Sequence, residues 1–258
     1  MRHRRKLGRA GSLFVALFAA GCATVPPTLT DPAGDPLEPL NRNMLEVNLA
    51  LDRTIIEPVA RAYREVVPEP VRDRIRNVID NLAEPRIFVN DILQGRFQAA
   101  GITTGRFALN SVFGLAGMFD VATPYGLPRQ SGDFGETLAV WGAGDGPYLV
   151  LPVFGPSNVR DAFGLGVDLY TTPPAHMLSG HAGVALNYSL GAVDGVDLRA
   201  RNLETLEEIK RAALDLYVSL RSLTRQRRAA ELREARGIDQ TPDELPDPEA
   251  PDRAPSRP

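Results

Sequence analysis

The most informative segment of the chain is residues 99–119, which read AAGITTGRFALNSVFGLAGMF. It carries a single charge, Arg106, and the helix that it predicts is apolar on nearly every face. Surface helices of soluble domains carry polar residues on one face. Two interpretations are therefore open. The segment is either a central core helix, or a helix in or against lipid whose glycines permit close backbone approach.

The chain before this segment shows helical spacing as well. Apolar residues recur every three or four positions from Leu40 to Ile55, and this stripe predicts a helix that ends before Pro58. A second stripe runs from Val71 to Leu82 and predicts a helix that Pro85 breaks or kinks.

The chain after this segment adds one extended region and one more helix. Residues 141–164 are rich in Gly and Pro around the β-like run Tyr148–Leu151, which predicts extended or turn structure. A stripe from Leu206 to Leu223 predicts a helix that docks onto the core, because it lasts too few heptads for a coiled coil. We therefore expect a mainly α-helical single domain over residues 36–236, with a short extended segment near residues 141–160.

The N-terminus has the features of an export signal. Basic residues precede the apolar run Ala10–Ala20, which is far shorter than the roughly 20 residues of a membrane-spanning helix. The run ends on Ala19-Ala20-Gly21-Cys22, an arrangement that resembles a lipobox. We therefore expect residues 1–21 to be a signal peptide and Cys22 to carry lipid. Cys22 is the single cysteine, so no disulfide can stabilise the fold.

Two further segments lack the composition of a packed domain. Residues 22–35 are rich in proline and read as a tether between the lipid and the folded part. Residues 237–258 hold six prolines and six acidic residues with few apolar side chains, which predicts a disordered acidic tail.

Charge and motif content exclude several function classes. Loss of the five basic residues before Cys22 changes the formal net charge from −3 to −8, which argues against nucleic acid as a partner. No GxSxG elbow is present, and the spacing of Gly142, Gly144 and Gly146 does not match a phosphate loop. His176 and His181 lack the nearby ligands of a zinc site. The sequence therefore predicts no enzyme activity, no catalytic residue, no metal site and no cofactor.

Short motifs follow one another in order from Asp35 to Arg228. The first is DPLEPLNR at residues 35–42, and later ones are Pro70-Val71-Arg72, Asn81-Leu82 with Glu84-Pro85, Leu93-Gln94-Gly95, Asn110-Ser111, Phe134-Gly135, Gly155-Pro156-Ser157 and Arg160-Asp161. Taken together, these blocks resemble the VacJ/MlaA family of outer-membrane lipoproteins in order and approximate spacing. Leu40 departs from the family, where an aromatic residue is common, and residues 171–194 do not match it.

The resemblance implies a fold and a function. The fold is a ring-like helical domain seated in the periplasmic leaflet of the outer membrane. Family members take glycerophospholipids that have strayed into the outer leaflet and pass them through an amphipathic channel to a soluble periplasmic carrier, which maintains lipid asymmetry. Trimeric porins are their usual companions. The alternative is a structural lipoprotein that supports a porin or the envelope without moving lipid.

A phospholipid path needs an apolar wall for acyl chains and a polar or cationic lining for the headgroup. The segment 99–119 offers both. We expect Arg106 to lie near a headgroup, with pairing to a carboxylate as the equal alternative. The side chains expected to contact lipid are Phe107, Val112, Phe113, Leu115, Met118 and Phe119.

Overall fold

The computed structural model describes residues 35–172 and 181–237. The predicted signal peptide, Cys22 with its tether, His176 and the acidic tail lie outside the described residues. The chain divides into two units, and the elements discussed below belong to the second, Pro39–Pro258.

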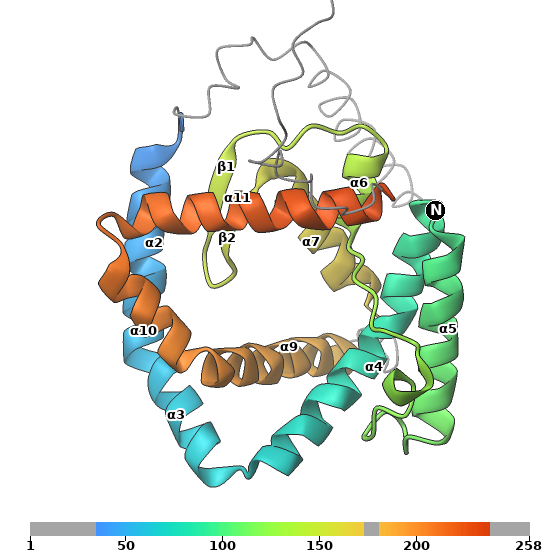
Figure 1. The fold of residues 1–258 in the computed structure, drawn as a ribbon. Helices are drawn as coiled ribbons and strands as arrows, with labels where there is room; N and C mark the ends of the chain where they lie inside the picture. Colours follow the sequence, from blue (N-terminus) through green and yellow to red (C-terminus); the bar gives the residue numbers. More distant parts are fainter. Residues whose placement is uncertain (1–34, 173–180, 238–258) are drawn as a thin grey trace, which may run out of the picture. The chain divides into compact units, whose positions relative to one another are not determined.

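The described residues are mainly helical, which confirms the predicted fold class (Figure 1). The helices are α2 (Glu38–Leu51), α3 (Glu57–Val66), α4 (Glu69–Leu93), α5 (Phe97–Val112), α6 (Phe134–Val140), α7 (Val159–Thr171), α9 (His181–Arg201), α10 (Leu203–Ala212) and α11 (Leu216–Ala235). A π-helical turn, η3 (Asp52–Ile56), and a 3₁₀ turn, η4 (Thr123–Tyr125), lie between them. No helix in the described ranges is long and apolar enough to cross a membrane.

The predicted extended run is one strand of a hairpin. Strand β1 (Tyr148–Leu151) pairs antiparallel with β2 (Gly155–Asn158). Figure 1 shows α11 crossing this hairpin, and α11 also contacts α6. Elsewhere α4 packs along α5, α6 packs against α7, and α3 packs against α9.

Helical structure continues through Pro58, where an end was predicted, and through Pro85, where a break or a kink was predicted. Pro58 lies in the first turn of α3, and helical structure continues into it from α2 through η3. In η3 the Glu57 N–H donates to the Asp52 carbonyl, so the wider turn comes just before the residue that has no N–H to donate. Similarly, α4 is not broken at Pro85 but continues to Leu93, because its long contact with α5 outweighs one missing backbone bond.

The stripe predicted as one helix over Leu206–Leu223 is divided between two. Helix α10 ends at Ala212 and α11 begins at Leu216, with Ala213 in an extended conformation between them. The Asp215 carboxylate accepts a hydrogen bond from the Val218 N–H at 3.1 Å and caps the start of α11. The apolar spacing continues across the break between α10 and α11, although the helix does not. The Asp215 cap starts a new helix in spite of that spacing.

The segment 99–119 is also not one continuous helix. After α5 ends at Val112, Leu115 and Ala116 adopt left-handed backbone angles (φ 53° and 57°), and Gly117 follows at φ 91°. Gly117 packs so closely on α4 that an added Cβ would lie 2.5 Å from the Asn81 Cβ. Residues 113–119 therefore form a tight turn against α4 instead of a further helical turn.

Two asparagines of α2 fasten the hairpin. Asn41 donates to the Tyr148 carbonyl and accepts from the Val150 N–H, both at 2.9 Å. Asn48 donates to the Leu151 carbonyl at 2.8 Å and accepts from the Val153 N–H at 2.9 Å. These amides pair with backbone groups of β1 and of the hairpin turn, as a neighbouring strand would.

Helices α6 and α7 cross at a pair of glycines. A Cβ added to Gly164 of α7 would lie 2.3 Å from the Gly135 nitrogen and 2.7 Å from its Cα in α6. Both of these atoms belong to the backbone, so no side-chain movement can relieve the contact.

We therefore predict that Gly164→Ala lowers the free energy of unfolding by about 3 kcal/mol, since it overpacks the crossing. Gly166→Ala in the same helix is the matched control, because an added Cβ there meets nothing within 4 Å. That variant should be neutral or more stable by roughly 0.5–1 kcal/mol. Urea unfolding followed by circular dichroism measures both changes, and equal effects would contradict the crossing as the cause.

Candidate functional site

The distribution of polar and apolar side chains reverses that of an ordinary globular protein. Among the described residues, buried apolar side chains are few and often alanine, whereas many charged or amide side chains are buried. Examples of the buried charged residues are Glu84, Asp91 and Asp197. Large apolar side chains are exposed on most helices instead. This distribution of side chains is favourable where the surroundings of the protein are themselves apolar.

Helix α5 shows this reversal within a single element. Its buried face includes Thr103, Arg106 and Asn110, which lie on the side that packs against α4. Its exposed side chains include Phe97 and Val112, at 71 % and 70 % exposure. The core-helix interpretation of this segment therefore fails, because the polar side chains face the protein and the large apolar ones face outward.

Arg106 is buried and fully engaged. Its Nε donates to Glu84 Oε1 at 2.9 Å, and one terminal nitrogen donates to the Thr123 hydroxyl at 2.9 Å and the Leu127 carbonyl at 2.6 Å. The other terminal nitrogen lies 3.4 Å from Asp120 Oδ2. Of the two alternatives for Arg106, the structure shows pairing with carboxylates. Burial raises the pKa of the Glu84 carboxyl, and the Arg106 guanidinium opposes that rise.

The Arg106 network shapes the loop that follows α5. Asn110 Oδ1 accepts hydrogen bonds from the Val121 and Ala122 N–H groups at 2.8 and 2.9 Å. Asp120 accepts from the Thr123 hydroxyl at 2.5 Å and from the Thr123 N–H at 3.2 Å. These polar contacts hold α5 and the loop after it in place. They therefore also set the orientation of the apolar side of α5 and the position of the turn that follows it.

The six side chains expected to contact lipid are all exposed, from 39 % for Phe107 to 71 % for Phe113. We call this surface the apolar tip, and its members are Phe107, Val112, Phe113, Leu115, Met118 and Phe119. The Arg74 guanidinium lies over the Phe119 ring, 4.3 Å from its centroid. A cation is therefore held beside the apolar tip, although it is not the Arg106 that the sequence suggested.

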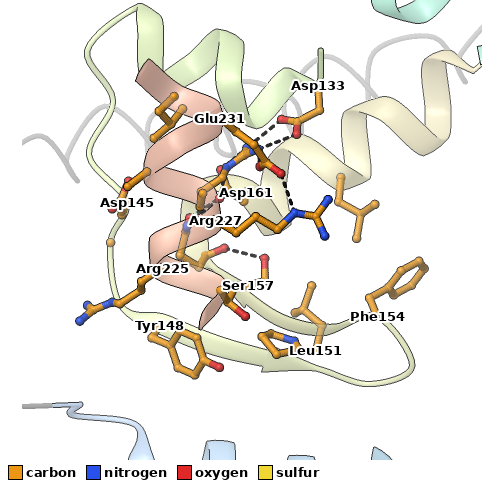
Figure 2. Close-up of a pocket in the computed structure, with 18 of the residues that line it drawn as sticks. Asp133, Asp145, Tyr148, Leu151, Phe154, Ser157, Asp161, Arg225, Arg227 and Glu231 are labelled. Atoms are coloured by element: carbon orange, nitrogen blue, oxygen red, sulfur yellow. Dashed lines mark hydrogen bonds and ion pairs between the residues drawn. The ribbon is translucent and has the colours of Figure 1, made fainter. Parts of the chain in front are cut away.

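A pocket that the sequence did not predict lies between α11, the hairpin and α7, with a volume of about 780 Å³ (Figure 2). Its apolar wall includes Leu151 and Phe154 of the hairpin region. Its charged wall comes from four arginines and five acidic residues: Arg86, Arg225, Arg227, Arg228, Asp133, Asp145, Asp161, Asp168 and Glu231.

Arg228 is the centre of the charged wall. Its guanidinium donates to Asp133 at 2.8 and 2.9 Å and to Asp161 at 2.9 Å through two nitrogens. It also reaches Glu136 at 3.2 Å and Glu231 at 3.1 Å. The carboxylates come from positions far apart in the chain, so spacing could not reveal the cluster. The one local signal in the sequence is that two of its short motifs, Phe134-Gly135 and Arg160-Asp161, lie beside this cluster.

The described residues show no cluster of three side chains that could hold a metal ion. His181 lies exposed at the start of α9. The described side chains of the site offer apolar surface and guanidinium–carboxylate pairs.

Comparisons with known proteins bear on this geometry. The family model described as "MlaA lipoprotein" matches residues 33–231. This chain belongs to the MlaA lipoprotein family. A family relative from Haemophilus influenzae, named intermembrane phospholipid transport system lipoprotein MlaA, is 34 % identical over 215 residues, covering 81 % of this chain and 84 % of the relative.

Other members of the MlaA family agree in sequence and structure. The protein of the same name from Escherichia coli K12 is 35 % identical over 213 residues, covering 80 % of this chain and 81 % of the relative. A solved structure, described as the structural basis for maintenance of bacterial outer membrane lipid asymmetry, superposes with a TM-score of 0.69 at 33 % identity. The match covers 77 % of this chain and 99 % of that one.

Glu136, which accepts a hydrogen bond from Arg228, gives the Arg228 cluster a pH dependence. Burial, together with the nearby Asp133 carboxylate, raises the pKa of Glu136 to about 7, from an ordinary value near 4.5. Below the unfolded pKa, Glu136 is protonated in both states and has no effect on stability. Between about pH 4.5 and 7 the unfolded chain releases this proton while the folded protein retains it, so stability falls over that range and levels off above it, where the folded carboxyl is also ionised.

We predict that Glu136→Gln gains about 3 kcal/mol of unfolding free energy relative to wild type between about pH 4 and pH 8. Urea unfolding of both proteins at the two pH values measures this change. A difference between variant and wild type that stays constant with pH would contradict the raised pKa.

Proposed function

We propose that this protein is an outer-membrane lipoprotein that removes mislocalised glycerophospholipids from the outer leaflet and passes them to a periplasmic carrier. The observation that carries the proposal is the apolar tip, whose side chains are exposed while the polar network beside them is buried. Membership of a family whose curated members are named for phospholipid transport supports it.

The apolar tip is more favourably placed in a lipid leaflet than in water. In water each exposed Å² of apolar surface costs about 25 cal/mol, whereas in a lipid leaflet it costs almost nothing. The turn at residues 113–119 brings apolar side chains together, and its backbone is held by the Asn110 carbonyl, which accepts from the Gly117 N–H, and by the Asn77 amide, which donates to the Met118 carbonyl. Acyl chains are partners that such a surface accepts without specific hydrogen bonds.

Lipid on Cys22 would hold the domain on the periplasmic face of the outer membrane. Each buried methylene contributes about 0.8 kcal/mol, so several acyl chains anchor far more firmly than a single one. Ala23 after the cysteine resembles the signal for forwarding to the outer membrane. The proposed partners there are a trimeric porin and the soluble carrier that receives the lipid.

Deletion of the gene tests the function directly. Outer-leaflet phospholipid should rise in the deletion strain and return to the wild-type level when the intact gene is restored. Native mass spectrometry of the purified protein separates a transporter from a scaffold, because a transporter should retain phospholipid. Unchanged outer-leaflet phospholipid in the deletion strain would overturn the proposal.

The apolar tip can be tested with a charge at its most exposed positions. We predict that the double variant Val112→Asp, Phe113→Asp binds phospholipid vesicles at least roughly tenfold more weakly, since it removes two apolar contacts worth 1.5–3 kcal/mol each. It should also fail to restore lipid asymmetry.

Leu214→Asp is the matched control for this variant, because Leu214 is fully exposed between α10 and α11, outside the apolar tip. That control should behave as wild type. Since the changed side chains are exposed, circular dichroism should show an unaltered fold in both variants. Normal vesicle binding by the double variant would contradict the role of the apolar tip.

The anchor makes a separate prediction. Cys22→Ala should leave a folded helical domain, because Cys22 precedes every described element. The protein should nevertheless fractionate away from the outer membrane and should not complement the deletion strain. Membrane fractionation and the outer-leaflet assay measure these outcomes. Full function from the soluble variant would show that the lipid anchor is dispensable.

A further inference from the structure

The pocket between α11 and the hairpin combines an apolar wall with a charged one. Leu151 and Phe154 supply apolar surface from the hairpin, and Leu165 and Leu232 add to it from α7 and α11. Its volume of about 780 Å³ lies within the roughly 300–1,000 Å³ typical of small-molecule sites. The pocket therefore has room for a polar headgroup and the first part of its tails.

The carboxylates on the charged wall are paired with guanidinium groups of the protein, which weakens their repulsion of an anion. Arg228 holds Asp133 and Asp161. Asp168 binds Arg86 at 3.1 Å and also accepts from Asn90 and from the Phe134 N–H. Because these negative charges face guanidinium groups of the protein, they offer little repulsion to an anionic ligand.

Arg227 differs from Arg228 because most of its donors remain available. Its Nε donates to Glu231 Oε1 at 2.8 Å, four residues along α11. No described residue accepts a hydrogen bond from its two terminal nitrogens, and its side chain is 84 % exposed. Glu231 thus orients the guanidinium while leaving its terminal N–H groups for another acceptor.

Figure 2 shows where this guanidinium lies. Arg227 extends toward the side of the pocket on which Leu151 and Phe154 lie, whereas Arg225 extends to the opposite side. The planar guanidinium is well matched to two oxygens of a phosphate group. A ligand with a phosphate and adjoining apolar chains would contact both Arg227 and the hairpin.

We propose that this pocket binds a glycerophospholipid through its phosphodiester on Arg227, with the start of its acyl chains against Leu151 and Phe154. The proposal rests on the proposed function and deepens it, because it assigns a headgroup site distinct from the apolar tip. Free phosphate is also an anion, but it has no acyl chains that could contact the apolar wall of the hairpin.

The test uses the full chain, purified and held in an amphipathic polymer, with three probes. These are a short-chain diacyl phosphatidylethanolamine, the same headgroup as glycerophosphoethanolamine without tails, and inorganic phosphate. Isothermal titration should show that the diacyl probe binds most tightly. Phosphate binding as tightly as the diacyl probe would overturn the assignment to lipid.

Variants then locate the site. Arg227→Gln should weaken binding of the diacyl probe roughly tenfold or more, since it removes charge-assisted hydrogen bonds. Arg233→Gln, at an exposed position of α11 that does not line the pocket, should bind as wild type. Phe154→Ser should weaken the diacyl probe and leave the tail-free headgroup unaffected. Equal affinities in Arg227→Gln and Arg233→Gln would overturn the proposal.

Failure of this site and failure of the proposed function are distinguishable. If Arg227→Gln binds the probe normally while the intact gene restores asymmetry in the deletion strain, only the pocket assignment falls. If the deletion strain shows normal outer-leaflet phospholipid, the transport function falls, whatever the titrations show.

Discussion

The buried ion pair between Arg106 and Glu84 is the constraint on which the α4–α5 region depends. Taking both charges out of water costs several kcal/mol each, and that cost is offset only when every donor finds an acceptor. All three guanidinium nitrogens of Arg106 have acceptors, which are Glu84, Thr123, the Leu127 carbonyl and the neighbouring Asp120, and this meets most of the condition. Because these partners lie on α4 and on the loop after α5, satisfying one guanidinium sets the positions of three segments.

Arg228 repeats the same solution near the hairpin, so the protein is organised by buried guanidinium groups instead of by a large apolar core. The apolar cluster of Leu45, Tyr148, Val150 and Tyr217 is small by comparison. A polar interior costs the protein little stability when its surroundings are lipid, because internal hydrogen bonds and ion pairs do not depend on water outside the protein. The exposed apolar surface and the charged interior are therefore two aspects of one adaptation.

Sequence reasoning predicted the helical class and the strand Tyr148–Leu151, and its motifs led to the family that the comparisons show. It misplaced helix ends at Pro58 and after Ala212, because periodicity reports which face is apolar and not where a π-helical turn or an Asp215 cap changes the backbone. It did not find the Arg228 cluster. Its carboxylates lie up to 95 residues from Arg228, and only the tertiary fold brings them together.

The asparagine clamp on the hairpin has a consequence for how the chain folds. Asn41 and Asn48 bind peptide groups of residues more than 100 positions later, so α2 cannot complete its contacts until those later residues are in place. Contacts between such distant residues form slowly. Until those contacts form, the apolar side chains of the helices stay exposed on a partly folded chain, a state that is prone to aggregate.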